Sequence, residues 1–528
     1  MTETRLDRHL KANRNRILLA IALVAFAAFA FYFFLNIYRY PSDMDARPIA
    51  FVFLAASLAA CGGLVLCYRV ISRGKLSQEK LFVIFMITFG VIYAALFLPF
   101  TIPDEGEHYL SAYRISNYIT FNTQQFGDER LLMRTCDLEL FGKLRADRLS
   151  PEYYSLLGGN FHMFAGDRSA SFIPAKFIRS APLGYIASAL GISLGRFFRL
   201  GALPTFYLGR LANLALYTVA VWWAIKRMPY GKTALFVISA LPMTLHLVAS
   251  YSYDYFVVAL AMLFVSQVLY MREKPGSVAA KDIVLCVIWG VLLAPAKLVY
   301  FPILLTVFLV PNEKFPFSKK KAAFIKTGIV LAWIAALLAV QLGSISNYMS
   351  GGNGVSWSED EVYSVSHMLS HPAEFFRVVF NTAYHFADYH TSMLIGNHMQ
   401  GTGEGLLPIF LWAPMLFVAL FSFLRRRDED EVRTLRPTAR VGVSLIAAAV
   451  CGMAALSMLF SWTPVSTNVI HGIQGRYYTP VLPLVALAMR GKLARPQNSD
   501  KYILFFFIYC NLLMPMVYFG QLFLPEFI

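Results

Sequence analysis

Residues 81–108 read LFVIFMITFGVIYAALFLPFTIPDEGEH, in which an uncharged, mostly apolar stretch from 81 to 100 runs directly into an acidic segment. About 20 apolar residues are needed to cross the roughly 30 Å hydrocarbon layer of a bilayer, and a helix crosses it without leaving backbone groups unpaired. The stretch therefore predicts a transmembrane helix that ends just before Asp104 and Glu105.

The rest of the chain has the same character. It is 57% hydrophobic and 15% charged, whereas charged residues make up about a quarter of a typical soluble domain. Pro295 divides one long apolar run into two spans. We therefore expect an all-α polytopic membrane protein with about 13 transmembrane helices. The predicted spans are 17–38, 48–70, 81–100, 205–225, 232–250, 254–271, 282–294, 298–311, 322–342, 406–424, 439–460, 477–490 and 502–523.

The net charge of +16 is concentrated in short connectors between the spans, which indicates positive-inside sorting rather than a nucleic-acid partner. With a cytoplasmic N-terminus, the clearly basic connectors are cytoplasmic, while both long loops and the C-terminus are extracytoplasmic. Apolar residues at helical spacing in 182–200 predict a helix along the membrane surface in the first loop. The chain then divides into an N-terminal three-helix segment, a first loop, a transmembrane core, a second loop and C-terminal helices: 1–100, 101–204, 205–342, 343–405 and 406–528.

Two adjacent carboxylates, Asp104 and Glu105, follow the third span. The ordinary interpretation is a solvated helix end. However, Pro103 breaks the helix there, and His108 follows Asp104 by four residues, so the two share a face if a helix resumes. A carboxylate partly withdrawn from water can act as a general base.

Two further ionisable residues adjoin apolar spans. Lys297 lies between two apolar helices, where a charge is costly unless it has a function or reaches the interface along its aliphatic stem. Asp254 lies among tyrosines at a helix start, where it either caps the helix or binds substrate. The sequence leaves both alternatives open for each residue.

The second long loop holds five of the ten histidines, at positions 367, 371, 385, 390 and 398. His385, Asp388 and His390 are spaced so that they could bind a divalent metal, which is the one cofactor we consider. Histidines in such loops are more often ordinary surface residues. Glycine-rich stretches at both ends of the loop suit a mobile lid.

Residues 103–108 (PDEGEH) and 113–116 (YRIS) resemble the opening signature of a family of predicted bacterial membrane proteins known as domain of unknown function 2142. Later segments fit the same pattern in the same order, so that the resemblance runs from about residue 100 to residue 490. These segments are Pro182-Leu183-Gly184-Tyr185, Leu194-Gly195-Arg196, Arg210-Leu211-Ala212-Asn213, Ser252-Tyr253-Asp254, Pro295-Ala296-Lys297 with Tyr300, and Gln474-Gly475-Arg476-Tyr477.

That family in turn resembles the GT-C glycosyltransferases, which take sugars from polyprenyl-phosphate carriers and whose first outer loop begins with an acidic pair. In those enzymes the loop usually follows the first span, whereas here two additional spans precede it. The resemblance implies transfer of a sugar from a polyprenyl-phosphate donor to an envelope glycan or lipid-linked acceptor, at the outer face of the bacterial cytoplasmic membrane. Membrane lipids are the remaining expected partners.

For this chemistry Asp104 is the expected base that takes the acceptor proton, and Glu105 is the alternative. Cations are needed to hold the departing phosphate. An envelope polysaccharide polymerase or ligase and a transporter of a lipid-linked glycan remain alternative functions. The expected substrate- and phosphate-binding residues are His108, Arg114, Arg179, Asp254, Lys297, Gln474, Arg476 and Tyr477.

Overall fold

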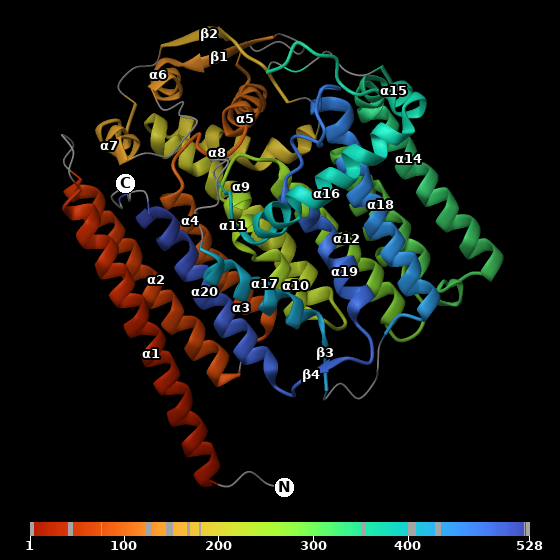
Figure 1. The fold of residues 1–528 in the computed structure, drawn as a ribbon, viewed down its shortest axis with the longest axis horizontal. Helices are drawn as coiled ribbons and strands as arrows, with labels where there is room; N and C mark the ends of the chain where they lie inside the picture. Colours follow the sequence, from red (N-terminus) through yellow and green to blue (C-terminus); the bar gives the residue numbers. More distant parts are fainter. Residues whose placement is uncertain are drawn as a thin grey trace.

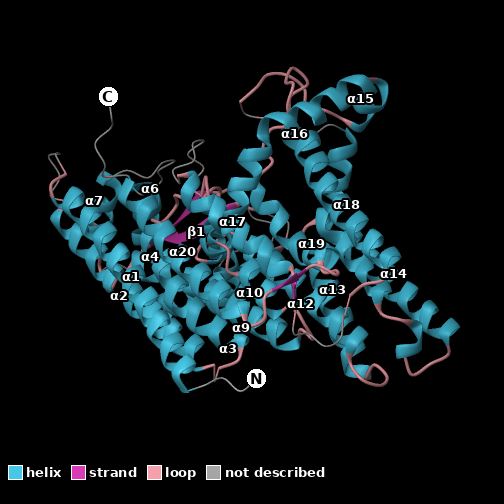
Figure 2. Ribbon diagram, turned by 60° about the horizontal axis from the view of Figure 1, so that its bottom comes forward, coloured by secondary structure: helices cyan, strands magenta, loops and turns pink. Residues whose placement is uncertain are grey.

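The computed structural model is almost entirely helical (Figures 1 and 2). It describes residues 5–40, 46–74, 76–122, 129–143, 151–165, 169–178, 181–350, 355, 357–399, 408–427, 434–521 and 523. The expected all-α polytopic membrane fold is confirmed, because eight helices in these ranges are long and apolar enough to cross a membrane. They lie within α1 (Arg5–Tyr38), α2 (Arg47–Arg73), the run α3 (Gln78–Phe85), η1 (Met86–Gly90) and α4 (Val91–Leu96), α9 (Ala202–Arg227), α12 (Asp254–Glu273), α14 (Lys319–Ser350), α18 (Pro437–Trp462) and α20 (Ser499–Gln521).

The remaining predicted spans are also helical, but they are shorter or interrupted. Proline accounts for several of the interruptions, because it lacks the N–H that continues a helix. Pro242, for example, starts a new helix in the middle of the span predicted at 232–250. These segments are α10 (Lys232–Ser239), α11 (Pro242–Val248), α13 (Ala280–Ala296), η3 (Leu298–Leu309), α17 (Ile409–Phe423), η5 (Gly475–Val481) and α19 (Leu482–Met489).

The connectors predicted to be cytoplasmic lie together at one end of the helices, which we call the opposite face. Thr233 accepts a hydrogen bond from Gln78 at 2.8 Å and donates one to Asp500 at 2.7 Å. Asp500 also pairs with Arg426, on the short strand β3 (Arg425–Arg426), which runs parallel to β4 (Ala494–Arg495). These contacts join four connectors that are distant in sequence, so the basic segments share one face.

The first long loop covers the other end, which we call the site face. An antiparallel pair of strands places Arg130 opposite Pro174, and the helices around it pack onto the ends of the membrane helices (Figure 1). The described part of the loop thus forms an ordered cap rather than an irregular connection. Its elements are α5 (Glu105–Ile119), β1 (Arg130–Arg134), α6 (Thr135–Lys143), α7 (Pro151–Gly159), β2 (Ala170–Pro174), η2 (Pro182–Tyr185) and α8 (Ile186–Phe197).

The helix expected within 182–200 is present as η2 and α8. Its small residues face α9: a Cβ on Gly191 would lie 2.4 Å from the carbonyl oxygen of Leu208, so only glycine permits this approach. Its large apolar side chains, including Leu190 and Phe197, are exposed. An exposed apolar stripe is the arrangement expected of a helix that lies against lipid.

The second long loop forms α15 (Val365–Ser370) and α16 (Pro372–Ile395), which stand above the ends of α14 and α18 (Figure 2). The loop has a small core of its own, in which Tyr363 and Val378 pack against Leu459 and Phe460 of α18. The site face is therefore enclosed by two separate caps, one from each loop.

Candidate functional site

The turn that joins α4 to α5 places Asp104 at the start of α5 in a left-handed conformation, with φ of 60°. Phe100 in the same turn also has a positive φ, of 63°. Such conformations are costly for residues other than glycine and tend to occur at functional sites. The Asp104 side chain is exposed, and its carboxylate forms no hydrogen bond or ion pair with any described residue. It is therefore available to a ligand.

The neighbouring Glu105 is buried and fully engaged. Its carboxylate accepts hydrogen bonds from Arg210 Nε at 2.9 Å and from an Arg210 terminal nitrogen at 2.6 Å. The backbone N–H groups of Phe100 and Tyr251 also donate to it, at 2.9 and 3.2 Å. The remaining Arg210 donors bind the carbonyl groups of Ala94, Phe97 and Leu98. Glu105 thus holds the strained turn against α9, and a structural role suits it better than the alternative role of base.

A second charged cluster lies where α12, α13, η3 and η5 meet. Lys297 Nζ is 3.2 Å from Asp254 Oδ1, and Arg476 Nε is 3.7 Å from Asp254 Oδ2. Lys297 Nζ also lies 4.4 Å from the centroid of the Tyr477 ring, a cation–π distance. We call these four residues the Asp254 cluster. Two cations share one carboxylate, so the cluster carries an excess of positive charge.

Unused hydrogen-bonding groups surround the Asp254 cluster. Arg476 is only 6% exposed, yet its Nε has no hydrogen-bond partner among the described residues, because Asp254 is too distant. The side-chain oxygens of Gln474 and Thr479 are also buried without a partner in the described part of the chain. Buried polar groups are normally satisfied, so these mark a place where a ligand or water would bind.

His108 and two tyrosines connect the cluster to Asp104. His108 Nδ1 lies 2.7 Å from the Tyr185 hydroxyl, and the His108 ring packs edge-on against Tyr253. Burial lowers the pKa of His108 to about 3, with Arg476 and Lys297 acting in the same direction and Asp254 opposing them. Burial also raises the pKa of Tyr185, and the carboxylates of Asp254 and Asp104 contribute to that rise. Asp104 therefore lies within electrostatic range of this group.

Of the residues expected at the site, the structure brings together His108, Asp254, Lys297, Arg476 and Tyr477, with Gln474 and Asp104 beside them. Arg114 differs, because its guanidinium stacks 4.3 Å from the Phe177 ring and its Nε donates to Tyr118. No contact of Arg114 with the Asp254 cluster is present in the described structure. Arg179 lies outside the described residues.

Residues that were not expected at the site complete it. Arg210 is the partner of Glu105, Tyr185 and Tyr253 hold His108, and the Tyr300 hydroxyl donates to the Tyr477 carbonyl at 2.9 Å. All four belong to the motif segments that the sequence itself singles out. Their position in those motifs was the sequence signal that could have identified them as site residues.

The second loop reaches the site through α16. A Cβ on Gly475 would lie 2.2 Å from the carbonyl oxygen of His390, so α16 rests directly on the segment that carries Arg476. His367 and His371 stack on each other at 4.5 Å, with Glu374 beside His367. In the ranges that the structure describes, no group of three or more His, Cys, Asp or Glu side chains could hold a metal ion.

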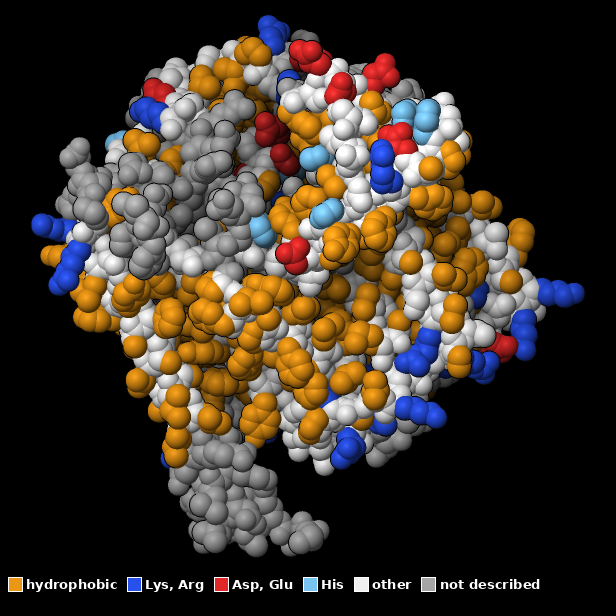
Figure 3. All heavy atoms as spheres, viewed as in Figure 1, with side chains coloured by type: hydrophobic (Ala, Val, Ile, Leu, Met, Phe, Trp, Pro, Cys, Tyr) orange, Lys and Arg blue, Asp and Glu red, His pale blue; other side chains and the backbone are white. Residues whose placement is uncertain are grey.

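The site face is hollowed near these residues. Figure 3 shows acidic side chains within a depression on this face and histidines along its edge. A cleft of about 640 Å³ is lined by Glu107 of α5, one turn after Asp104, together with Arg130 and Lys176. The cleft therefore lies between α5, the helix that begins at Glu105, and the strand pair of the first loop.

Comparison with known proteins identifies a family. The family model described as "Predicted membrane protein (DUF2142)" matches residues 85–485, which include every element of the site. No match to the chain was found among curated proteins or among solved structures.

Proposed function

The chain belongs to the DUF2142 family of predicted membrane proteins, and from this premise we propose that it is a membrane-embedded glycosyltransferase of the GT-C type. It would transfer a sugar from a polyprenyl-phosphate donor to an envelope glycan or a lipid-linked acceptor. The observation that carries the proposal is the Asp254 cluster, in which Lys297 and Arg476 share one carboxylate and retain unused binding capacity next to the unpaired Asp104.

The proposed reaction assigns a task to each charged group. The acceptor hydroxyl attacks the anomeric carbon of the donor sugar, and Asp104 takes the hydroxyl proton. The bond between that carbon and the phosphate oxygen breaks, and its electron pair leaves with the phosphate. Lys297 and Arg476 stabilise the negative charge that remains on this leaving group. Asp254 holds the two cations side by side before the donor arrives.

Neutral groups complete the donor site. His108 is an uncharged imidazole at neutral pH, because burial lowers its pKa to about 3, so it orients substrate by hydrogen bonding rather than by charge. Tyr253 and Tyr477 present rings on which a sugar can stack, and both lie within cation–π distance of Lys297. Gln474 offers a buried amide oxygen without a partner in the described structure.

The basic connectors support an orientation. They gather on the opposite face, so the positive-inside rule supports a cytoplasmic position for that face and for the N-terminus. We propose accordingly that the site face and the C-terminus are extracytoplasmic and that the membrane is the cytoplasmic membrane of a bacterium. Cysteine labelling from outside intact cells tests this: Phe121→Cys on the site face should react, and Leu493→Cys on the opposite face should not. Both positions are exposed.

The direct test of the function uses purified protein in nanodiscs with polyprenyl-phosphate sugars, a polyprenyl-diphosphate glycan and candidate acceptors. Product formed only from the monophosphate donor supports the proposal. Product formed only from the diphosphate donor indicates the second candidate, a polysaccharide polymerase or ligase, for which two adjacent cations would also suit the larger leaving charge. Movement of lipid-linked glycan across the bilayer without any new glycosidic bond would indicate a transporter instead.

A further inference from the structure

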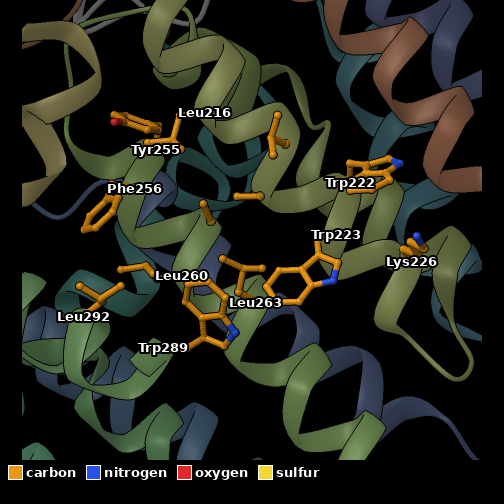
Figure 4. A pocket seen from close by; sticks show the side chains of 13 residues that line it. Leu216, Trp222, Trp223, Lys226, Tyr255, Phe256, Leu260, Leu263, Trp289 and Leu292 are labelled. Atoms are coloured by element: carbon orange, nitrogen blue, oxygen red, sulfur yellow. The ribbon is translucent and has the colours of Figure 1, made fainter. Parts of the chain in front are cut away.

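An apolar groove of about 500 Å³ lies between α9, α12 and α13 and shares no lining residue with the cleft beside α5. Figure 4 shows its aromatic and aliphatic side chains, with Trp223 of α9 and Trp289 of α13 near its centre. The two indole rings meet edge to face, with centroids 5.5 Å apart. Rigid walls of this kind give the groove a defined shape.

One end of the groove meets the Asp254 cluster. The wall formed by α12 begins at Asp254, and the wall formed by α13 ends next to Lys297, and these two residues form the 3.2 Å ion pair. Tyr255, the residue after Asp254, lines the groove, and its buried hydroxyl has no hydrogen-bond partner among the described residues. Two walls of the groove therefore converge at the ion pair of the proposed phosphate site.

The groove extends from that end into the membrane region. From Asp254 to Leu263, which also lines it, α12 rises by about 14 Å, or about half of a bilayer's hydrocarbon thickness. Lys226 lines the far end, near the opposite face, with its ammonium 5.0 Å from the Trp222 ring. Val219 on the rim is 62% exposed, so the groove opens sideways towards lipid.

We propose that this groove holds the part of the donor's polyisoprenoid chain that lies nearest its phosphate. This inference rests on the proposed function and names the lipid that the same site would recognise. Lipid tails are as apolar as the groove, so apolarity alone gives a chain no reason to leave the bilayer. The preference for one lipid must come from the fit of the chain against the paired indoles and from a phosphate held by Lys297 and Arg476 at its end.

The test fills the groove without altering the charged cluster. Ala220 of α9 lines the groove and is partly exposed, so Ala220→Phe places a ring inside it. Ala215→Phe is the matched control, because it makes the same change on the same helix at an exposed position outside the groove lining. If Ala220→Phe prevents folding, Ala220→Leu replaces it.

The probe is a photoreactive polyprenyl phosphate without a sugar, with phosphatidylglycerol and unlabelled polyprenyl phosphate as competitors. Labelling should map to α9, α12 and α13, should fall about tenfold in Ala220→Phe, and should be unchanged in Ala215→Phe. Unlabelled polyprenyl phosphate should compete, whereas phosphatidylglycerol should not. Labelling outside these three helices would overturn the inference. Equal competition by phosphatidylglycerol would also overturn it, because ordinary membrane lipid would then occupy the groove.

Transfer assays separate this inference from the proposed function. In the wild type, KM should be lower for a long-chain donor than for a short-chain one, and Ala220→Phe should abolish that difference by raising KM for the long-chain donor about tenfold. If sugar transfer occurs but KM depends neither on the chain length of the donor nor on the Ala220→Phe change, the groove inference fails and the proposed function stands. If groove labelling is specific but no sugar is transferred, the function fails and the lipid site stands.

Discussion

Asp104 and Glu105 are neighbours in sequence, yet they belong to two regions with opposite character. The Glu105–Arg210 pair is buried, and four hydrogen bonds to the carboxylate are in place. The Asp254 cluster, near Asp104, has a cation that is too distant for a hydrogen bond and several buried polar atoms without partners in the described structure. Both regions contain a buried arginine, but only one of them has binding capacity left.

The difference between the two charged regions indicates which of them stabilises the fold and which of them binds a ligand. A saturated network of charges contributes mainly by fixing the geometry of its surroundings, and breaking it leaves a buried charge uncompensated. An unsaturated network keeps donors for a ligand at some cost to the stability of the empty protein. Arg210 should therefore matter for folding, and Lys297 and Arg476 should matter for substrate.

The largest effect on stability should come from Arg210→Gln. This change leaves Glu105 charged and buried, which should lower the free energy of unfolding by about 3–5 kcal/mol. Thermal unfolding in detergent measures the loss. The matched control is Arg476→Gln, in which Asp254 keeps Lys297 as its partner and no buried carboxylate is left unpaired, so the loss should be clearly smaller. Equal losses in the two variants would show that both regions are structural.

Asp104→Asn should produce the largest effect on activity. Asparagine keeps the size and the helix-start position of the side chain but cannot accept the acceptor proton, so kcat should fall about 10³-fold. Because the Asp104 carboxylate has no partner among the described residues, the melting temperature should stay close to that of the wild type. Transfer assays on one preparation measure kcat, and melting curves on the same preparation measure the melting temperature. Full activity in Asp104→Asn would remove Asp104 as the base.

The contrast within the acidic pair also shows the limit of prediction from sequence. Hydropathy and the break at Pro103 were sufficient to place both carboxylates at the end of a membrane helix. They could not reveal which of the two is saturated, because the partner Arg210 is 105 positions away and is brought close only by packing. Local pattern predicts where an element ends, whereas burial and pairing depend on the whole fold.

Other expected residues also depend on partners that are distant in sequence. Asp254 and Lys297 were both predicted at helix ends, and their ion pair follows from the packing of α12 against α13. The eight long spans were predictable because about 20 apolar residues have few alternatives in a bilayer. Hydropathy also located the shorter segments, but it could not show that η3 and η5 are 3₁₀ helices with internal prolines.

A smaller effect on activity is expected for Lys297→Gln. The variant removes one of two cations from the leaving phosphate, and Arg476 remains, so transfer should fall about 10²-fold. Lys297→Arg preserves the charge and should recover much of that loss. Binding of polyprenyl phosphate, measured by competition with a labelled analogue, should weaken in Lys297→Gln. If binding and transfer both stay at wild-type values, the cluster does not hold the phosphate.

The smallest expected effect concerns His108, which connects Asp104 to the Asp254 cluster. Burial lowers its pKa from the ordinary 6.5 to about 3, with Arg476 and Lys297 adding to the shift. The unfolded chain therefore binds a proton between these values that the folded protein does not, so stability should fall as pH falls below 6.5. From pH 7 to pH 5 this loss amounts to about 2 kcal/mol. His108→Gln should remove it, as seen in melting curves over that range, whereas His385→Gln, at an exposed position, should not. If His108→Gln leaves the slope unchanged, burial does not hold the imidazole neutral, and the role proposed for a neutral His108 in the donor site fails.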